Sequence, residues 1–301
     1  MDVVRSIDLP TLPLFRRGKV RDTYDLGDAL LMVATDRISA FDVVLPTEIP
    51  HKGAVLTQLS SFWFEQTNGL VPNHLLTADV TAFPPELSPY TDLLRGRSMV
   101  VRKADRIDVE CVVRGYLAGS AWAEYQQSRT IAGEPMPSGL RRGDRLPAPL
   151  FTPAIKHDNQ HDVTIPSSEL RQIVGAELAG DLEEASRDLF DAASEFALRR
   201  GMLIADTKIE FGSVGGKLLV IDELLTPDSS RFWDASAHAP GDEPASFDKQ
   251  FVREWLERSG WNKEPPGPDL PSDVVVGTTA RYMEAYERLT GSVLAGYQAE
   301  E

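Results

Sequence analysis

The sequence has a single cysteine and no long apolar run. Cys111 alone cannot form an internal disulfide or a cysteine-rich zinc site. No stretch approaches the roughly 20 apolar residues of a membrane-spanning helix, and the first residues lack the basic-then-apolar pattern of a secretory signal. We therefore expect a cytoplasmic protein with no membrane partner. Cys111 lies in an apolar run and is expected to be a buried core residue.

Positive charge is also scarce. Lysine and arginine number 31 against 46 aspartates and glutamates, which gives a net charge of −15. This balance argues against a nucleic-acid partner, because binding to the phosphate backbone depends on basic residues. The basic residues nevertheless cluster in a few segments, so an anionic small molecule is still a possible ligand if those segments meet in space.

The order of the expected elements indicates an α+β fold. With 301 residues, 42% of them hydrophobic, the chain can bury one large or two smaller cores. Residues 1–105 have mainly strand-like patterns, interrupted by one helix after Gly53, and a larger mixed region, 106–301, follows. We expect a cleft between the two regions. The stretch from Ser128 to Pro149, rich in glycine, proline and arginine, is expected to be an exposed excursion.

The segment from Ile204 to Arg231 predicts a β-hairpin with charged residues on one face. Asp206, Lys208 and Glu210 alternate with apolar residues, so in a strand the three share a face. The glycines after Phe211 supply the turn, and the returning strand ends at Asp222. A regular two-residue turn would put Asp222 on the face opposite Glu210. We therefore predict one bulged residue among the glycines, which would bring the two carboxylates together.

Two interpretations of this hairpin are open from its residues. Carboxylates held close together repel one another, so a cation between them, most naturally magnesium, would explain the arrangement. The alternative is a solvated edge hairpin in which Lys208 takes part in a ladder of cross-strand ion pairs.

Two polar segments near the start of the chain are candidate functional sites. Gly18–Asp28 predicts a hairpin with Lys19 and Arg21 on alternate positions, able to lie over a polyphosphate, although it does not have the sequence of a Walker loop. After the next strand, Asp36 and Ser39 belong to a charged interruption between two apolar runs. Such a loop is more typical of a functional site than of a structural turn.

Further anion-binding candidates lie in the second region. Arg114 at a strand end and Ser120 near a helix start suit a phosphate group, because the arginine can donate two hydrogen bonds and the helix start presents free N–H groups. The alternative is a short helix capped by Ser120 or Gly119 beside a surface arginine. Lys156 and Asp162 lie in a proline-preceded loop, and Arg231 lies directly after the carboxylate hairpin.

Together these segments resemble the SAICAR synthetase family, phosphoribosylaminoimidazole-succinocarboxamide synthases of purine biosynthesis. A single segment would be weak, but seven blocks in the same order make coincidence very unlikely. The blocks span residues 18–256: GKVRDTYDLGD, DRISAFD, VECVVRGYLAGS, FTPAIKHDNQHD, IADTKIEFG, IDELLTPDSSRFW and FDKQFVREWL.

The resemblance implies a fold related to protein kinases and ATP-grasp enzymes, with a small β-rich lobe over a larger mixed lobe and ATP in the cleft. It implies a ligase that joins carboxyaminoimidazole ribonucleotide (CAIR) to L-aspartate with ATP and Mg²⁺.

The implied metal ligands are Glu210 and Asp222. The implied cofactor-binding residues are Lys19, Arg21, Lys103 and Glu110, with backbone between Lys103 and Asp108 on the adenine. The implied catalytic residues are Lys208, Lys156 and Asp36. The implied substrate-binding residues are Ser39, Arg114, Ser120, Asp162, Arg231 and Lys249.

Some questions are open at this point. Lys249 and Arg253 are rival candidates for one basic contact in the last block. A small-molecule kinase is the alternative activity, because kinase-like folds use the same lysine and paired acidic residues. A non-catalytic nucleotide-binding regulator would lack part of the basic or acidic set, and none is missing. The chain is expected to be a monomer or a homo-oligomer.

Overall fold

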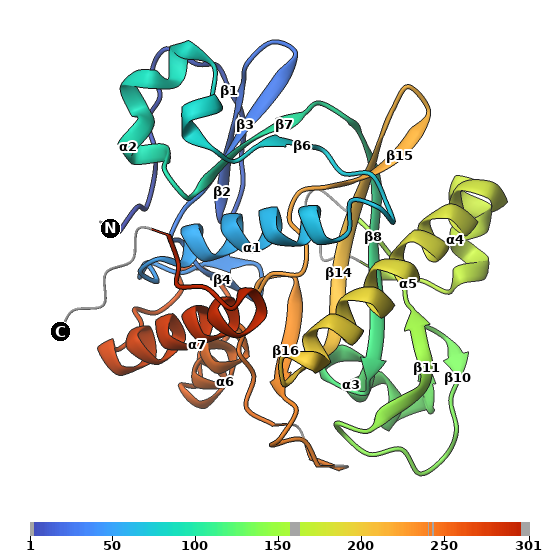
Figure 1. Cartoon of the computed structure of the whole chain (residues 1–301). Helices are drawn as coiled ribbons and strands as arrows, with labels where there is room; N and C mark the ends of the chain where they lie inside the picture. Colours follow the sequence, from blue (N-terminus) through green and yellow to red (C-terminus); the bar gives the residue numbers. More distant parts are fainter. Residues whose placement is uncertain (1–2, 157–162, 240, 243, 296–301) are drawn as a thin grey trace.

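The computed structural model describes residues 3–156, 163–239, 241–242 and 244–295, and these build two antiparallel β-sheets with helices around them (Figure 1). The helices and strands confirm the α+β class expected from the sequence. Within the described ranges, no helix has both the length and the apolar composition needed to cross a membrane.

The first sheet has five strands, in the order β1-β2-β3-β7-β6. All neighbours are antiparallel, and β3 lies at the centre with four buried residues at its end. Its strands are β1 (Leu14–Arg17), β2 (Arg21–Asp25), β3 (Ala29–Ala34), β6 (Leu75–Thr77) and β7 (Ser98–Arg102). A separate two-stranded hairpin, β4 (Ser39–Ala40) with β5 (Val43–Val44), follows β3.

The second sheet is built on two long strands, β8 and β14, which pair along most of their length. The other strands join this pair, with β11 and β12 on β8 and with β15 and β16 on β14. Its strands are β8 (Asp105–Tyr116), β11 (Arg145–Phe151), β12 (Ala154–Ile155), β13 (Val163–Thr164), β14 (Met202–Val214), β15 (Lys217–Ile221) and β16 (Ser230–Asp234).

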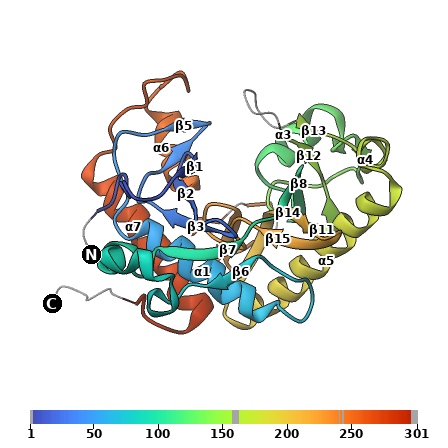
Figure 2. The same cartoon turned by 90° about the horizontal axis from the view of Figure 1, so that it is seen from above.

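The α-helices distribute unevenly over the two sheets. The long α5 packs across β8 and β14, while α1 packs against β3 and α7 (Figure 1). Seen from above, α6 and α7 lie beside the first sheet, and α3, α4 and α5 beside the second (Figure 2). The bounds are α1 (Lys52–Gln66), α2 (Thr91–Leu94), α3 (Gly119–Ser128), α4 (Ser167–Val174), α5 (Ala176–Arg199), α6 (Gln250–Arg258) and α7 (Ser272–Thr290).

Residues from opposite ends of the sequence complete one hydrophobic core. Ile38, Leu45 and Ile49, which follow the first three strands, are buried against Val252 of α6 and Val274 of α7. The sheets divide between β7 and β8, where the sequence predicted a boundary, but the helices late in the sequence return to pack on the earlier part.

Three local predictions were wrong. Two short 3₁₀ helices, Val80–Ala82 and Pro85–Tyr90, lead into α2, so the first region has more than one helix. The excursion is not simply exposed, because it contributes β9 (Thr130–Ile131), β10 (Glu134–Pro135) and most of β11, and buries Ile131 and Leu146. Helix α3 has Ala118 as its N-cap and no side-chain cap, in place of Ser120 or Gly119.

The carboxylate hairpin forms as predicted except at its turn. Val214 pairs with Lys217, so Gly215 and Gly216, both at positive φ, form a regular two-residue turn with no bulge. The predicted bulge among the glycines is therefore wrong. Instead, β15 ends at Ile221, and Asp222 leaves the strand in a left-handed conformation with φ of 67°. This backbone reversal, not a bulge, changes the direction of the Asp222 side chain.

Candidate active site

Four carboxylates and three basic side chains gather where β8, β14 and β15 meet. Glu110 of β8 lies directly opposite Glu210 of β14, so both point to one face of the sheet. Lys156 Nζ lies 2.6 Å from Glu210 Oε1, and Lys208 Nζ lies 2.6 Å from Glu110 Oε1. The opposite face, with Ala205, Thr207, Ile209 and Phe211, is buried as predicted.

Arg21 brings the first sheet to this cluster. Its guanidinium Nη2 lies 2.5 Å from Asp222 Oδ2 and 3.1 Å from Glu223 Oε1, although Arg21 precedes both by about two hundred residues in the chain. The cluster, which we call the carboxylate cluster, therefore consists of Glu110, Glu210, Asp222, Glu223, Arg21, Lys156 and Lys208.

Burial and mutual charge shift the pKa values within the carboxylate cluster. The pKa of Asp222 is raised to about 6. Burial is the largest cause, Glu210 and Glu223 act in the same direction, and Arg21 only partly offsets them. Burial also acts on Glu210, but Lys208 and Lys156 outweigh it and lower its pKa. Burial disfavours the Lys208 ammonium, yet Glu110 and Glu210 raise the pKa of Lys208 above its usual value.

A second cluster lies four residues earlier on the same face of β14. The Asp206 carboxylate binds two guanidiniums, Arg231 at 2.5 Å and Arg114 at 3.3 Å. Arg114 also contacts the hydroxyl oxygens of Thr152 at 3.0 Å and Ser120 at 3.4 Å. Burial lowers the pKa of Arg114, with Asp206 partly offsetting the effect. The predicted residues Arg114, Ser120 and Arg231 are therefore together, and we call them, with Asp206, the arginine cluster.

Gly119, the first residue of α3, lets the Arg231 guanidinium lie against the helix start. A Cβ atom at this position would be 2.8 Å from Arg231 Nη2, and Gly119 has φ of 54°, which other L-residues rarely adopt. The absence of a side chain at residue 119 thus leaves room for the guanidinium beside the first turn of a ten-residue helix, where both the guanidinium and the free N–H groups can donate to one anion.

Lys19 and Lys103 are more exposed than Arg21. Lys19 pairs with Asp42 at the tip of the β4–β5 hairpin, and both side chains are about half exposed. Lys103, between β7 and β8, places its Nζ 2.7 Å from Asp25 Oδ1. In this structure each of these two lysines contacts a carboxylate of the first sheet or of the hairpin that follows it.

The charged loop after β3 contains one buried and one strained part. Asp36 is fully buried and accepts hydrogen bonds from the backbone N–H groups of Val4 and Gly53 and from Arg97. This placement favours a structural role for Asp36 over the expected catalytic one. Ser39 is only partly buried, at the start of β4. The turn residues Phe41 and Asp42 both have positive φ without being glycine, a strain of about 1 kcal/mol or more each that is common near functional sites.

Lys249, the residue before α6, is half-buried. Its pKa is lowered to about 8, mainly by burial, and the nearby cations Arg253, Lys208 and Lys52 act in the same direction against the opposing effect of Asp228. The guanidinium of its rival Arg253 lies 5.9 Å from the centre of the Phe41 ring, beside the strained turn. The remaining predicted residue, Asp162, lies outside the described residues.

The sequence matches the family model described as SAICAR synthetase over residues 14–268. The phosphoribosylaminoimidazole-succinocarboxamide synthase of Desulfosudis oleivorans is 52% identical over 290 residues, which cover 96% of this chain and 99% of that protein. The chain belongs to the SAICAR synthetase family.

Two solved structures extend this likeness to the fold. The SAICAR synthase of Saccharomyces cerevisiae, in a complex with SAICAR, is 40% identical, with a TM-score of 0.87 over 97% of this chain and 99% of that one. A type-2 SAICAR synthetase in complex with ADP is 24% identical, with a TM-score of 0.68 over 92% of this chain and 98% of that one, and supports the fold alone. The chain therefore has the SAICAR synthase fold.

The donor set of the carboxylate cluster fits a magnesium ion that is completed by other ligands. Within the described ranges, no three histidine, cysteine, aspartate or glutamate side chains are placed to hold a metal alone. Mg²⁺ commonly takes only one or two carboxylates and completes its shell with water and substrate phosphates. Glu210 and Asp222 supply such a pair of oxygen donors, and the Glu210 charge acts on Asp222.

Sequence reasoning missed several residues that organise the site. It did not predict the ion pair of Glu223 with Arg21 or those of Asp206 with Arg114 and Arg231. It also missed a buried triad in which Asp228 binds Lys52 Nζ and the Tyr282 hydroxyl, each at 2.7 Å. The available signal for Lys52 was a charged residue just before the apolar run Ala54 to Leu56. Its partners are more than 170 residues away and could not be inferred locally.

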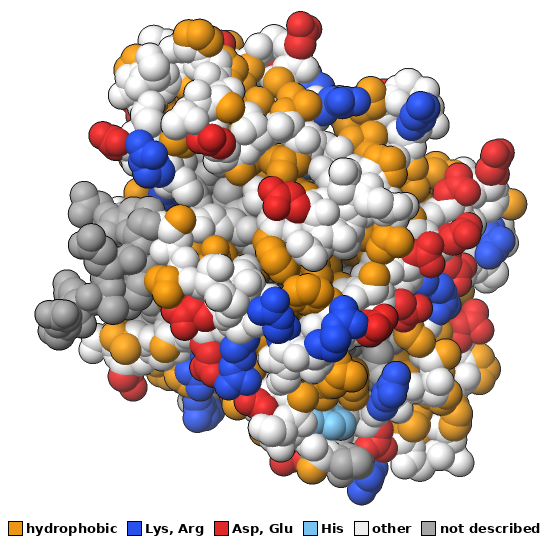
Figure 3. Space-filling model, in the orientation of Figure 1, with side chains coloured by type: hydrophobic (Ala, Val, Ile, Leu, Met, Phe, Trp, Pro, Cys, Tyr) orange, Lys and Arg blue, Asp and Glu red, His pale blue; other side chains and the backbone are white. Residues whose placement is uncertain are grey.

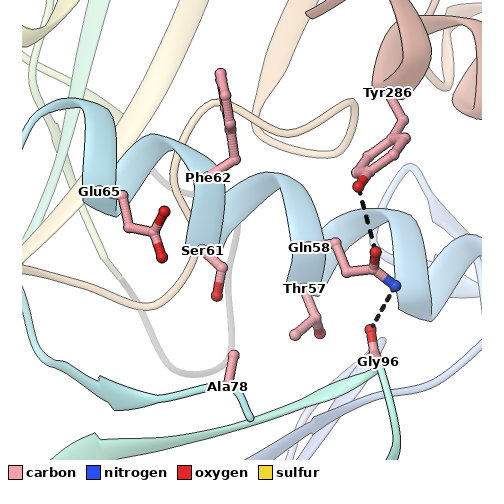
Figure 4. Close-up of a pocket in the computed structure, with 8 residues that line it drawn as sticks. All are labelled: Thr57, Gln58, Ser61, Phe62, Glu65, Ala78, Gly96 and Tyr286. Carbon is pink, nitrogen blue, oxygen red and sulfur yellow. Dashed lines mark hydrogen bonds between the residues drawn. The ribbon is translucent and has the colours of Figure 1, made fainter. Parts of the chain in front are cut away.

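A pocket of about 240 Å³ lies apart from these clusters, along the outer face of α1. Gln58 donates a hydrogen bond to the Gly96 carbonyl and accepts one from Tyr286 across it (Figure 4). Its lining contains none of the predicted site residues. The lining residues are Thr57, Gln58, Ser61, Phe62, Glu65, Ala78, Gly96 and Tyr286.

Much of the net negative charge lies on the surface away from the clusters. Acidic side chains gather over α4 and α5 in the space-filling view (Figure 3). Helix α5 alone carries many of them, on the side away from the buried Leu182, Leu189 and Ala193. The bulk charge of −15 therefore does not preclude an anionic ligand at the arginine cluster.

Proposed function

We propose that this chain joins the carboxylate of CAIR to the amino group of L-aspartate, using ATP and passing through an acyl phosphate. Membership of the SAICAR synthetase family supports the overall activity, that of a phosphoribosylaminoimidazole-succinocarboxamide synthase in purine biosynthesis. The observation that carries the residue assignment is the position of the arginine cluster and the carboxylate cluster on one face of one strand.

The chemistry requires activation of a carboxylate. A carboxylate is a poor electrophile, and its oxygen is a poor leaving group. Transfer of the γ-phosphoryl group to it gives a mixed anhydride that an amine can attack, with phosphate as the leaving group. No side-chain nucleophile is needed, so the protein must mainly position the substrates and offset negative charge.

The nucleotide end of the site is assigned to residues of both sheets. Lys19, Arg21 and Lys103 would bind ATP, with Glu110 and the backbone after Lys103 beside the nucleotide. Glu210 and Asp222 would hold Mg²⁺, which when bound offsets charge on the β- and γ-phosphates. Arg21 supports this assignment because, as the first residue of β2, it already contacts the carboxylates Asp222 and Glu223 of the second region.

The ribonucleotide end is assigned to the arginine cluster. Two guanidiniums bind the Asp206 carboxylate, so this place gathers several positively charged hydrogen-bond donors. A phosphate monoester carries up to two negative charges and can accept hydrogen bonds from both arginines, from Ser120 and from the start of α3. We assign the CAIR phosphate to this cluster.

Lys156 and Lys208 lie between these ends and would offset charge on the reacting carboxylate. Both amines are already within 4 Å of Glu110 and Glu210. Ser39, Lys249 and Arg253 are assigned to the aspartate side.

The proposed division into a β-rich lobe, residues 1–105, and a larger lobe, 106–301, with a kinase-like or ATP-grasp-like relation, would put ATP between the two sheets.

One coupled assay tests the activity. ADP release is followed with ATP and Mg²⁺, with CAIR and aspartate added singly and together. We expect release only when both are present, together with one equivalent of free phosphate. Transfer of phosphate onto a hydroxyl acceptor would instead indicate the alternative kinase. Release that is unchanged when aspartate is replaced by alanine would contradict the proposed amine substrate.

A further inference from the structure

Lys249 is held at a fixed place by its neighbours. The Phe247 N–H donates to the Phe232 carbonyl at 2.9 Å, so the chain before α6 is tied to β16. The Asp248 carboxylate accepts from the Gln250 N–H at 2.6 Å, directly on the other side of Lys249. The backbone of Lys249 is therefore anchored on both sides, and its amine is close enough to Lys208 of the carboxylate cluster for the two positive charges to repel each other.

Asp228, the carboxylate that favours the protonated form of Lys249, already has a hydrogen-bond partner on each of its two oxygens. Asp228 Oδ2 accepts from the fully buried Lys52, and Asp228 Oδ1 accepts from Tyr282. Among the residues that the structure describes, the Lys249 amine has neither a hydrogen bond nor an ion pair. One buried negative charge is thus matched by Lys52, and Lys249 is an additional amine with no counter-ion among the described residues.

Charged groups on every adjoining element act on this amine. Lys52 of α1, Lys208 of β14 and Arg253 of α6 repel its protonated form, while Asp228, before β16, favours it. Burial is the largest influence, and together these groups lower the pKa of Lys249 to about 8. A substantial fraction of the amine is therefore neutral slightly above neutral pH, which is uncommon for lysine.

The amide-forming step needs a proton acceptor. The α-amino group of free aspartate is mostly an ammonium at neutral pH and has no lone pair with which to attack. We propose that the neutral Lys249 amine accepts a proton from the aspartate ammonium and so generates the attacking amine. This role rests on the proposed synthase activity and its acyl phosphate.

The proposed step balances in atoms and charge. An N–H bond of the ammonium breaks and its proton bonds to Lys249 Nζ. The freed electron pair forms the C–N bond, and the bond from the acyl carbon to the phosphate oxygen breaks, with its electrons leaving on phosphate. The second proton lost by the nitrogen leaves with phosphate or water, and Lys249 then returns its proton to solvent.

The decisive comparison is between Lys249→Arg and Lys249→Met. Arginine retains the positive charge but cannot accept a proton, whereas methionine has neither property. If Lys249 is the base, both variants lose about 100-fold or more in kcat with little change in the KM for aspartate. If Lys249 only binds an aspartate carboxylate, Lys249→Arg stays within a few-fold of the parent and Lys249→Met loses activity mainly through KM. That second pattern overturns the proposal.

The pH profile gives an independent readout. The rate of the parent at saturating substrate should rise through an apparent pKa near 8, and this limb should be absent in both variants. Tyr282→Phe frees one oxygen of Asp228, so the limb should move to higher pH while activity above it is retained. A limb of unchanged position in Lys249→Arg contradicts the proposal.

The controls separate folding and function. Lys217→Met alters an exposed lysine at the end of the hairpin and should match the parent in rate and pH profile. Removing a half-buried amine that has no counter-ion among the described residues should leave the thermal midpoint of Lys249→Met unchanged or raised. If the parent itself forms no amide from CAIR and aspartate, the synthase activity fails. If the parent is active and Lys249→Arg is equally active, only the base assignment fails.

Discussion

The two ends of the charged face of β14 hold different sets of charged side chains. At Asp206, two guanidiniums share one carboxylate. At Glu210, four carboxylates surround three basic side chains. The two positions are four residues apart, about 13 Å along a strand. One strand can therefore present an anion-binding site and a cation-binding site at a fixed separation, without any loop to set the distance.

Removal of charge at the acidic end should have the largest effect. Glu210→Gln keeps the size of the side chain but loses the charge that we assign to Mg²⁺, so kcat should fall about 100-fold or more. The exposed Glu195→Gln on α5 is the matched control and should behave like the parent. Steady-state kinetics and thermal melting check both. Near-normal turnover in Glu210→Gln would count heavily against the metal assignment.

At the basic end, the expected loss is in substrate binding. Arg231→Lys keeps one charge but loses the two-pronged hydrogen bonding of the guanidinium. The KM for CAIR should rise roughly 10- to 100-fold, since a hydrogen bond to a charged group contributes about 1.5–3 kcal/mol, and kcat should change less. Arg199→Lys, at an exposed pair on α5, is the control. A loss confined to kcat would show that the phosphate is bound elsewhere.

Gly119→Ala tests the geometry of the basic end without changing its charge. The added methyl group would push the Arg231 guanidinium from the start of α3. We expect a threefold to tenfold higher KM for CAIR, equal to roughly 1 kcal/mol, and a lower thermal midpoint from the left-handed backbone. Gly180→Ala, in a helix with open space around the position, should be neutral or stabilising. An unchanged KM for CAIR in Gly119→Ala would show that Gly119 has no part in phosphate binding.

The apolar face of the same strands should give the smallest effect on activity. Burial raises the pKa of Cys111 on β8 to about 12 from 9.0. The folded protein thus binds the thiol proton more tightly than the unfolded chain does. As pH rises from 9 to 12, the contribution of this thiol to the free energy of unfolding therefore falls by about 1.4 kcal/mol per pH unit.

Two measurements check this prediction. Urea unfolding of the parent and of Cys111→Ala at pH 7.5 and pH 10 should show a steeper decline for the parent. A thiol reagent should react with the native protein only after denaturant is added. Rapid reaction of native Cys111 would contradict its burial.

The predictable part of the site is the part that depends on strand alternation. Lys208 and Glu210 share a face because residues two apart always do in a strand. The position of Asp222 could not be inferred, because a single aspartate at positive φ has no local sequence signal. Asp36 is a similar case. Its partners Gly53 and Arg97 are 17 and 61 residues away, so the polar loop could not be distinguished in advance from a buried anchor.

The core shared by Ile38, Leu45, Val252 and Val274 has a consequence for how the chain folds. Its earlier residues are synthesised roughly two hundred residues before the helices that cover them. Until α6 and α7 are made, the apolar surface that follows the first strands stays open to water. We therefore expect a nascent chain that lacks residues beyond 250 to be prone to aggregation and to expose this surface to chaperones, even though every strand of both sheets has already been synthesised.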